Sequence, residues 1–192
     1  GQSKAFLEIG GKPLVARVVS TMVEVCREVM IVTKNPLDYL DFDVKIVRDL
    51  APGQGPLGGL STGLFYAHYD WVLAVGCDLP FLKAALLANL AERALSSPGG
   101  ARALVPRTKD GWQPLAAAYS KACFKPAQEL LNKGGHKLDD LMNHGVNWKP
   151  VAAEELRAVD QELVSFFNIN TPEDLDRARA EIESAPDEVE NG

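Results

Sequence analysis

Apolar residues recur along the chain in short segments with two different periods. In residues 14–27 they return every three or four positions, which predicts an amphipathic helix starting just after Pro13. Residues 29–33 and 44–47 are compact runs rich in β-branched side chains, which predict strands. Residues 71–76 are apolar throughout, the pattern of a strand buried on both faces. Further helices are predicted for residues 57–69 and 81–95.

The second half of the chain follows a less regular pattern. Strands are predicted within residues 101–107 and 113–120, and helices for residues 124–131 and 137–144. A last helix is predicted after Thr171, a good N-cap residue followed by Pro172. Helices alternating with strands that are apolar on both faces predict one α/β domain over residues 1–183, with three Rossmann-like layers and a mainly parallel sheet.

Charge and composition narrow the class of protein. Five of the 26 acidic residues lie in the last twelve positions, which contain no Lys or Arg, so the net charge of −6 belongs mostly to the C-terminus. Residues 184–192 are therefore predicted to be an acidic, disordered tail. The remainder is nearly neutral and lacks the basic excess of a nucleic-acid binder. No apolar run reaches about 18 residues, no secretory leader is recognised, and the three cysteines are widely spaced, so we expect a cytoplasmic protein without a membrane span.

The glycine-rich stretch "GQGPLG" at residues 53–58 matches a dinucleotide-binding pattern. Two details count against that interpretation. Five residues separate the preceding strand from the first glycine, and Pro56 removes an N–H group from a loop that would have to offer such groups to a pyrophosphate. The alternative is structural, because glycines also make tight turns and let a helix pack closely on a sheet.

Two acidic residues follow predicted strands. Asp49 comes after the second strand, and Asp78 ends the apolar strand within "GCDLP". Because the carboxyl ends of parallel strands meet at one edge of a sheet, both carboxylates are expected there together with the glycine-rich loop. Magnesium prefers one or two carboxylates plus phosphate oxygens, so Asp78 is a candidate Mg²⁺ ligand. The alternative role for Asp78 is the N-cap of a helix starting at Phe81.

Six motifs in order carry a resemblance to a known family. They are "KAFLEIGGKPL", "VTKN", "RDLAPGQGPLGGLSTGL", "CDLPFL", "QPLAAAYS" and "FNINTPEDL". Together they resemble the molybdenum cofactor guanylyltransferases, within the wider family of nucleotidyltransferases, from residue 1 to about residue 180. That family begins with a strand and the loop L-A-G-G-x-S-x-R-M-G. Gly1 matches the last glycine of this loop, so the resemblance implies a domain that is incomplete at its N-terminus in the chain as given.

The resemblance implies roles for particular residues. Lys4 and Asp78 would be catalytic, with Lys4 on the nucleotide phosphates and Asp78 holding Mg²⁺. Asn35 and Asp49 would lie against the nucleotide, and Gly55, Pro56, Leu57, Gly58 and Gly59 would shape the pocket for base and ribose. Gln113, Asn168 and Asn170 would lie on the acceptor side of the cleft. For the two asparagines the alternative is loop capping at the entry of the last helix.

The activity implied is transfer of GMP from GTP to molybdopterin, the molybdenum cofactor, with release of pyrophosphate. The implied partners are these two substrates, with transient contacts to other cofactor-biosynthesis proteins and molybdoenzymes. Two alternatives stay open. One is a CTP-dependent molybdopterin cytidylyltransferase, although "CDLP" favours GTP, and the other is a non-catalytic, nucleotidyltransferase-like partner that binds the cofactor.

Overall fold

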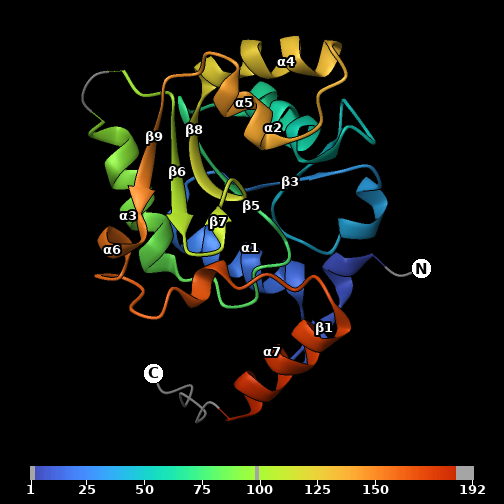
Figure 1. Ribbon diagram of the computed structural model, residues 1–192. Coiled ribbons are helices and arrows are strands. Elements are labelled where there is room, and N and C mark those ends of the chain that lie inside the picture. Colours follow the sequence, from blue (N-terminus) through green and yellow to red (C-terminus); the bar gives the residue numbers. More distant parts are fainter. Residues whose placement is uncertain (1–2, 98–99, 185–192) are drawn as a thin grey trace.

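The strands form the middle layer of the molecule (Figure 1), which a computed structural model describes for residues 3–97 and 100–184. Strands β3 (Met30–Thr33) and β4 (Lys45–Arg48) form a parallel pair. A second sheet contains five strands, in which β5, β8, β6 and β7 are neighbours in that order and β9 pairs with β6. Their bounds are β5 (Trp71–Val75), β6 (Ala103–Thr108), β7 (Gly111–Trp112), β8 (Ala116–Ser120) and β9 (Trp148–Ala152). A short hairpin, β1 (Glu8–Ile9) and β2 (Lys12–Pro13), lies apart from them.

The expected α/β class is confirmed, and its five-stranded sheet is mixed. Strand β8 runs antiparallel to both β5 and β6, whereas β6 and β9 are parallel. The physical reason lies in the connection between β6 and β8. It spans only residues 109–115, whereas a crossover to a parallel strand needs a dozen or more residues. Strands β5, β6 and β9 still share one direction, so their carboxyl ends lie at one edge.

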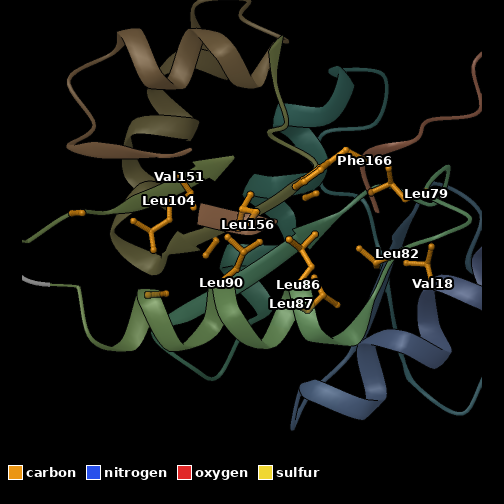
Figure 2. Packing of buried hydrophobic residues seen from close by; sticks show 14 residues of the cluster. Val18, Leu79, Leu82, Leu86, Leu87, Leu90, Leu104, Val151, Leu156 and Phe166 are labelled. Atoms are coloured by element: carbon orange, nitrogen blue, oxygen red, sulfur yellow. The ribbon is translucent and has the colours of Figure 1, made fainter. Parts of the chain in front are cut away.

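Helices cover both faces of the strand layer, as the three-layer expectation requires. Helices α1 (Leu14–Val25) and α3 (Ala84–Leu95) lie on one face, and α2 (Gly55–Tyr66), α4 (Phe124–Asn132) and α5 (Leu138–Asn143) lie on the other (Figure 1). Alternate residues of β8 divide between two cores: Ala116 and Ala118 pack with α3, while Ala117 and Tyr119 pack with α2. The core on the α3 side is shown in Figure 2, where Leu86, Leu87 and Leu90 project toward the strands.

Short helices and one terminal helix complete the described chain. The 3₁₀ turns are η1 (Lys4–Phe6), η2 (Pro36–Tyr39), η3 (Lys121–Cys123) and η4 (Val164–Phe166), and the remaining α-helices are α6 (Ala153–Leu156) and α7 (Pro172–Ser184). The predicted tail begins at Ser184, which ends α7, while residues 185–192 lie outside the described residues. Within residues 3–97 and 100–184, no helix has the length and apolar character needed to cross a bilayer.

Two helix boundaries differ from the sequence prediction. Helix α2 starts at Gly55, before the apolar run, and α3 starts at Ala84 and not at residue 81. Lys83 takes the N-cap position of α3, and its N–H group donates to Ser165 Oγ at 3.1 Å. The alternative role of Asp78 as N-cap of this helix is therefore wrong. The sequence analysis also missed β9 and the β1–β2 hairpin.

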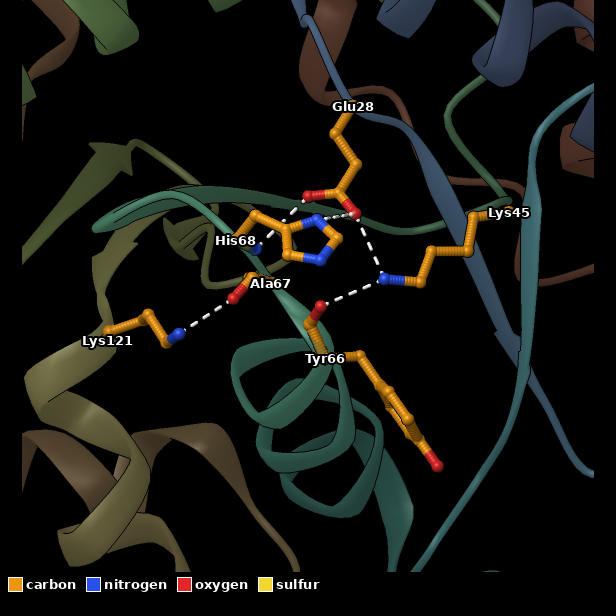
Figure 3. Close-up of polar contacts among 6 residues, drawn as sticks. All are labelled: Glu28, Lys45, Tyr66, Ala67, His68 and Lys121. Atoms are coloured by element: carbon orange, nitrogen blue, oxygen red, sulfur yellow. Dashed lines mark hydrogen bonds and ion pairs between the residues drawn. The ribbon is translucent and has the colours of Figure 1, made fainter.

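Buried and half-buried charges tie distant segments together. Asp160 is only 1% exposed, and its carboxylate accepts from Ser165 N at 2.9 Å and pairs with Lys83 Nζ at 3.0 Å. At the amino ends of β3 and β4, Glu28 binds Lys45 and His68, and Lys45 also donates to the Tyr66 carbonyl (Figure 3). Burial alone would raise the pKa of Glu28, but the bonds from Lys45 and His68 outweigh it and lower that pKa.

Candidate active site

Asp78 lies where β5 leaves the sheet. Its carboxylate folds back over Gly76, so closely that a Cβ atom at residue 76 would lie 2.5 Å from Asp78 Oδ1. Such a separation is well below any normal contact, so glycine leaves room for this rotamer. The other carboxylate oxygen, Oδ2, lies 3.6 Å from Lys4 Nζ, and both side chains remain open to solvent, at 24% and 40% exposure. A cation and a carboxylate are thus paired at the carboxyl edge of the sheet.

Asn170 completes this cluster from the other end of the chain. Lys4 Nζ donates to Asn170 Oδ1 at 3.2 Å, and the N–H group of Ile169 donates to the carbonyl of Asp78 at 3.0 Å. Asn170 is itself held by α7, because its N–H group donates to Asp174 Oδ2 at 3.0 Å. Lys4, Asp78 and Asn170, which the sequence analysis assigned to phosphate, metal and acceptor, therefore lie together.

Asp49 stabilises the loop between β4 and α2 at the same edge of the sheet. Its Oδ1 atom accepts from the N–H group of Ala51 at 2.9 Å and from Thr62 Oγ1 at 3.0 Å, and Thr62 Oγ1 accepts from the N–H group of Leu50. These bonds close the loop from β4 onto α2. Thr62 was missed by the sequence analysis, since a threonine inside a helical run carries no signal of a partner thirteen residues earlier.

Backbone N–H groups of the glycine-rich loop donate to acceptors within the protein. Gly55 has a φ of +61°, and a Cβ atom there would lie 2.8 Å from the His136 carbonyl, which accepts from the N–H group of Leu57. The N–H group of Gly58 donates to the Gln54 carbonyl, and Pro56 has none. Few N–H groups remain for a pyrophosphate, so the rejection of a dinucleotide loop agrees with the geometry. Glycine at positions 55 and 58 allows close packing, while a Cβ atom at Gly59 would meet open space.

The remaining predicted site residues lie around this edge without joining the cluster. Asn35 is exposed just after β3, and its N–H group donates to Thr33 Oγ1 at 3.2 Å. Gln113 lies between β7 and β8 and donates through Nε2 to Thr108 Oγ1 at 3.1 Å. Asn168 donates through Nδ2 to the Phe166 carbonyl at 3.1 Å. Of the three residues assigned to the acceptor side, Asn170 is the one that contacts Lys4.

The electrostatics of the cluster favour charge neutralisation over nucleophilic catalysis. Burial raises the pKa of the Cys77 thiol, and the adjacent Asp78 carboxylate raises it further. Cys77 is therefore a neutral thiol near pH 7 and a poor nucleophile. The N–H groups of Asn170 and Thr171 lower the pKa of Asp174 by donating to its carboxylate. Asp174 thus stays ionised and keeps Asn170 in position.

Asp78 is the carboxylate of this cluster that could hold a cation. Among the described residues, no group of three or more His, Cys, Asp or Glu side chains is arranged around a metal position. Mg²⁺ needs no such cage, because it is commonly bound through one or two carboxylates plus water and substrate phosphates. A solvent-accessible Asp78 carboxylate fits that mode of binding.

Comparison with known proteins places the chain in a family. The sequence profile of the MobA-like NTP transferase domain matches residues 1–148. The chain belongs to this family. It is 35% identical over 188 residues to a molybdenum cofactor guanylyltransferase of Desulfosudis oleivorans, a match that covers 96% of this chain and 89% of the relative. It is 36% identical over 185 residues to a probable molybdenum cofactor guanylyltransferase of Pelotomaculum thermopropionicum, covering 96% and 88%. The resemblance inferred from the six motifs is thereby confirmed, and the chain belongs to a family of nucleotidyltransferase enzymes.

Solved structures agree with the fold. The crystal structure of molybdopterin-guanine dinucleotide biosynthesis protein A from Archaeoglobus fulgidus superposes with a TM-score of 0.84 at 26% identity, over 96% of this chain and 93% of that one. A 2-C-methyl-D-erythritol 4-phosphate cytidylyltransferase from Thermus thermophilus superposes with a TM-score of 0.69 at 19% identity, over 94% of each chain. The second likeness concerns the fold alone. Both agree with an α/β nucleotidyltransferase domain.

Proposed function

We propose that this protein transfers GMP from GTP to molybdopterin and releases pyrophosphate. The observation that carries the proposal is the cluster of Lys4, Asp78 and Asn170, which brings a cation, a carboxylate and an amide together at the carboxyl edge of the sheet. The choice of nucleotide and acceptor is supported by the relatives named molybdenum cofactor guanylyltransferase.

The reaction requires mainly alignment of the two substrates and neutralisation of the charge on the phosphate groups. An acceptor phosphate oxygen attacks the α-phosphorus of the nucleotide while the bond to pyrophosphate breaks, and negative charge accumulates on the phosphate oxygens. Lys4 Nζ offers a mobile positive charge for these oxygens, and Asn170 holds the ammonium group beside Asp78. When bound at Asp78, Mg²⁺ would neutralise further phosphate charge. Asp49 and Thr62 keep the glycine-rich loop closed on α2, where the base would lie.

The experiment compares wild-type protein with Asp78→Asn. Pyrophosphate release is measured with GTP, Mg²⁺ and molybdenum cofactor, and the dinucleotide product is identified by mass spectrometry. Loss of the charge at residue 78 should lower kcat by about 10² to 10³, the size typical of a lost electrostatic contact in a transition state. The matched control is Asp41→Asn, at an exposed position between η2 and β4, which should leave the rate unchanged. Equal rates for wild type and Asp78→Asn would contradict the assigned role of Asp78.

Nucleotide choice is tested separately by exchange of the substrate. GTP is expected to support pyrophosphate release and CTP is not, and omission of Mg²⁺ or addition of EDTA should stop the reaction. Turnover with CTP but not GTP would identify a cytidylyltransferase. Binding of molybdenum cofactor with no turnover of either nucleotide would instead identify a non-catalytic partner.

A further inference from the structure

A cavity of about 970 Å³ lies beyond the carboxyl ends of β6 and β9. Its walls come from the turn between β6 and β7, from α6, from η4 and from α7, and Figure 1 shows α6 directly at the end of β9. None of the residues assigned above to nucleotide, metal or acceptor lines it. A pocket of several hundred Å³ is the usual size for a small organic ligand. The cavity is therefore a candidate binding site separate from the candidate active site.

Four basic side chains from four different segments line this cavity. Arg107 belongs to β6, Lys109 to the turn that follows it, Arg157 to the end of α6 and Arg177 to α7. Across residues 3–97 and 100–184, none of the four forms an ion pair with a carboxylate oxygen within 4.0 Å. Arg157 instead donates through Nη1 to the carbonyl of Gln161. Their positive charges are thus left without a paired anion.

Two of the guanidinium groups are oriented by aromatic rings. The Cζ atom of Arg107 lies 5.0 Å from the ring centroid of Trp112, and that of Arg177 lies 5.2 Å from the ring centroid of Phe167. An aromatic ring holds a guanidinium group in one direction without cancelling its charge. The N–H groups at its edge can still donate in pairs to a phosphate or carboxylate.

Much of the remaining lining is apolar. Phe166, only 8% exposed, and the half-buried Val164 line the cavity together with Pro150 and Ala152 of β9. Leu163, which also lines it, has a φ of +55°, in the left-handed region that leucine rarely adopts. Such backbone strain gathers at ligand-binding segments. The cavity therefore combines an apolar part with a set of cations.

Three exposed carboxylates narrow the class of ligand. Asp110, Glu154 and Glu162 line the same cavity, so its cations outnumber its acids by one. This small excess disfavours a bare polyanion, which would be held by charge alone. A ligand that buries a flat apolar body and also carries phosphate groups matches both parts of the lining.

We propose that this cavity binds a nucleoside polyphosphate at a second site. Its base lies against the apolar lining around Phe166, and its phosphate chain lies among Arg107, Arg157 and Arg177. Cations from four separate segments match a chain of two or three phosphates better than a single phosphate group. Free cellular nucleotides and the GTP of the proposed reaction share this chemistry. The cavity and its cations carry the proposal, which does not depend on the proposed enzymatic activity.

The experiment follows the ¹⁵N-labelled, 192-residue protein by NMR during titration without Mg²⁺. The signals are the side-chain Nε–H groups of Arg107 and Arg177 and the backbone N–H groups of Thr108 and Leu163. GTP or ATP should shift all four saturably. Tripolyphosphate and guanosine, which each offer only one part of the ligand, should bind at least about tenfold more weakly.

The outcomes of this titration are distinct. Equal shifts with ATP and GTP would assign the site to nucleotides in general, and shifts with GTP alone would assign it to the substrate of the proposed reaction. No saturable shift with either nucleotide, or equal affinity for tripolyphosphate, would overturn the proposal. Signals of Asn35 and Gly59 report separately on nucleotide at the candidate active site, so failure there and failure at the cavity are distinguishable.

Single-charge variants test the location. Arg107→Gln and Arg177→Gln change exposed positions, so both should fold. Each should weaken nucleotide binding at the cavity about tenfold or more, the usual effect of losing one charge-assisted hydrogen bond, and leave the shifts of Asn35 and Gly59 unchanged. The matched control is Lys125→Gln, at an exposed position of α4 on the other face of the strand layer, which should bind within about threefold of wild type. Equal binding by all three variants would contradict the proposed location.

Discussion

At the scale of single residues, the candidate site depends on how closely the Asp78 carboxylate can approach the backbone of Gly76. The carboxylate occupies the place where a side chain of residue 76 would begin. Asp78 Oδ2 is turned toward Lys4 as a result, and Lys4 in turn contacts Asn170. Gly76, which the sequence analysis placed at the end of a predicted strand without a role of its own, therefore sets the direction of the carboxylate.

Gly76→Ala is expected to displace the Asp78 carboxylate and to leave the fold in place. A shift of about 1 Å in a group that aligns substrate typically costs about a hundredfold, so kcat/KM for nucleotidyl transfer should fall by that order. Steady-state kinetics and a circular dichroism spectrum check both parts. Gly63→Ala serves as control, since its Cβ atom has room. Unchanged kinetics in Gly76→Ala would show that the position of the carboxylate is not critical.

At the scale of elements, α7 positions the site through its first turn. Thr171 Oγ1 accepts from the N–H group of Asp174, while the Asp174 carboxylate accepts from the N–H groups of Asn170 and Thr171. This reciprocal pair is a capping box, and it holds Asn170 against Lys4. The predicted N-cap at Thr171 is confirmed, and the same turn also holds Asn170 in the candidate site.

Thr171→Ala should remove one of these bonds and lower the free energy of unfolding by about 1 kcal/mol, the usual cost of losing an N-cap. Because the cap also places Asn170, the KM for acceptor should rise in the same variant. Urea denaturation and kinetics measure the two effects. Glu173→Gln in the same exposed turn is the control and should change neither. A loss of stability with unchanged kinetics would assign the cap to folding alone.

The segment before η4 is held by the buried Asp160. Burial would raise the pKa of Asp160, but the bonds from Ser165 and Lys83 outweigh burial and lower it. A carboxylate with a lowered pKa stabilises the fold above its unfolded pKa, and this contribution is lost as the pH falls through the lowered value. Asp160→Asn should therefore lower the free energy of unfolding by roughly 2 kcal/mol at pH 7, and this loss should become smaller as the pH drops below about 4. Urea titrations at several pH values test this, and a constant difference would contradict it.

At the scale of the whole molecule, the described strands form a parallel pair, β3 and β4, and a five-stranded sheet. Helices α1 and α2 contact both groups of strands from opposite faces. These two helices therefore join segments that are far apart in the sequence into one core.

The local sequence pattern was enough to predict most helices and strands, and the short motifs indicated Lys4, Asp78 and Asn170 as site residues. The periodicity of residues 14–27 predicted α1, the β-branched runs predicted β3 and β4, and the position of Asp78 after an apolar strand indicated its place at the sheet edge. These features depend on neighbours a few residues apart, where side-chain spacing and backbone preference act directly. The resemblance that implied the family also rested on the order of short motifs.

Other features depended on residues far apart in the chain, and only the tertiary structure decided them. The direction of β8 was set by the short connection to β6, and the roles of Thr62 and His136 were set by partners that no local signal predicts. The sequence by itself determined which segments are buried, through their hydrophobicity. Which edges meet was decided in three dimensions, because hydrogen bonding between strands depends on backbone groups that every residue shares.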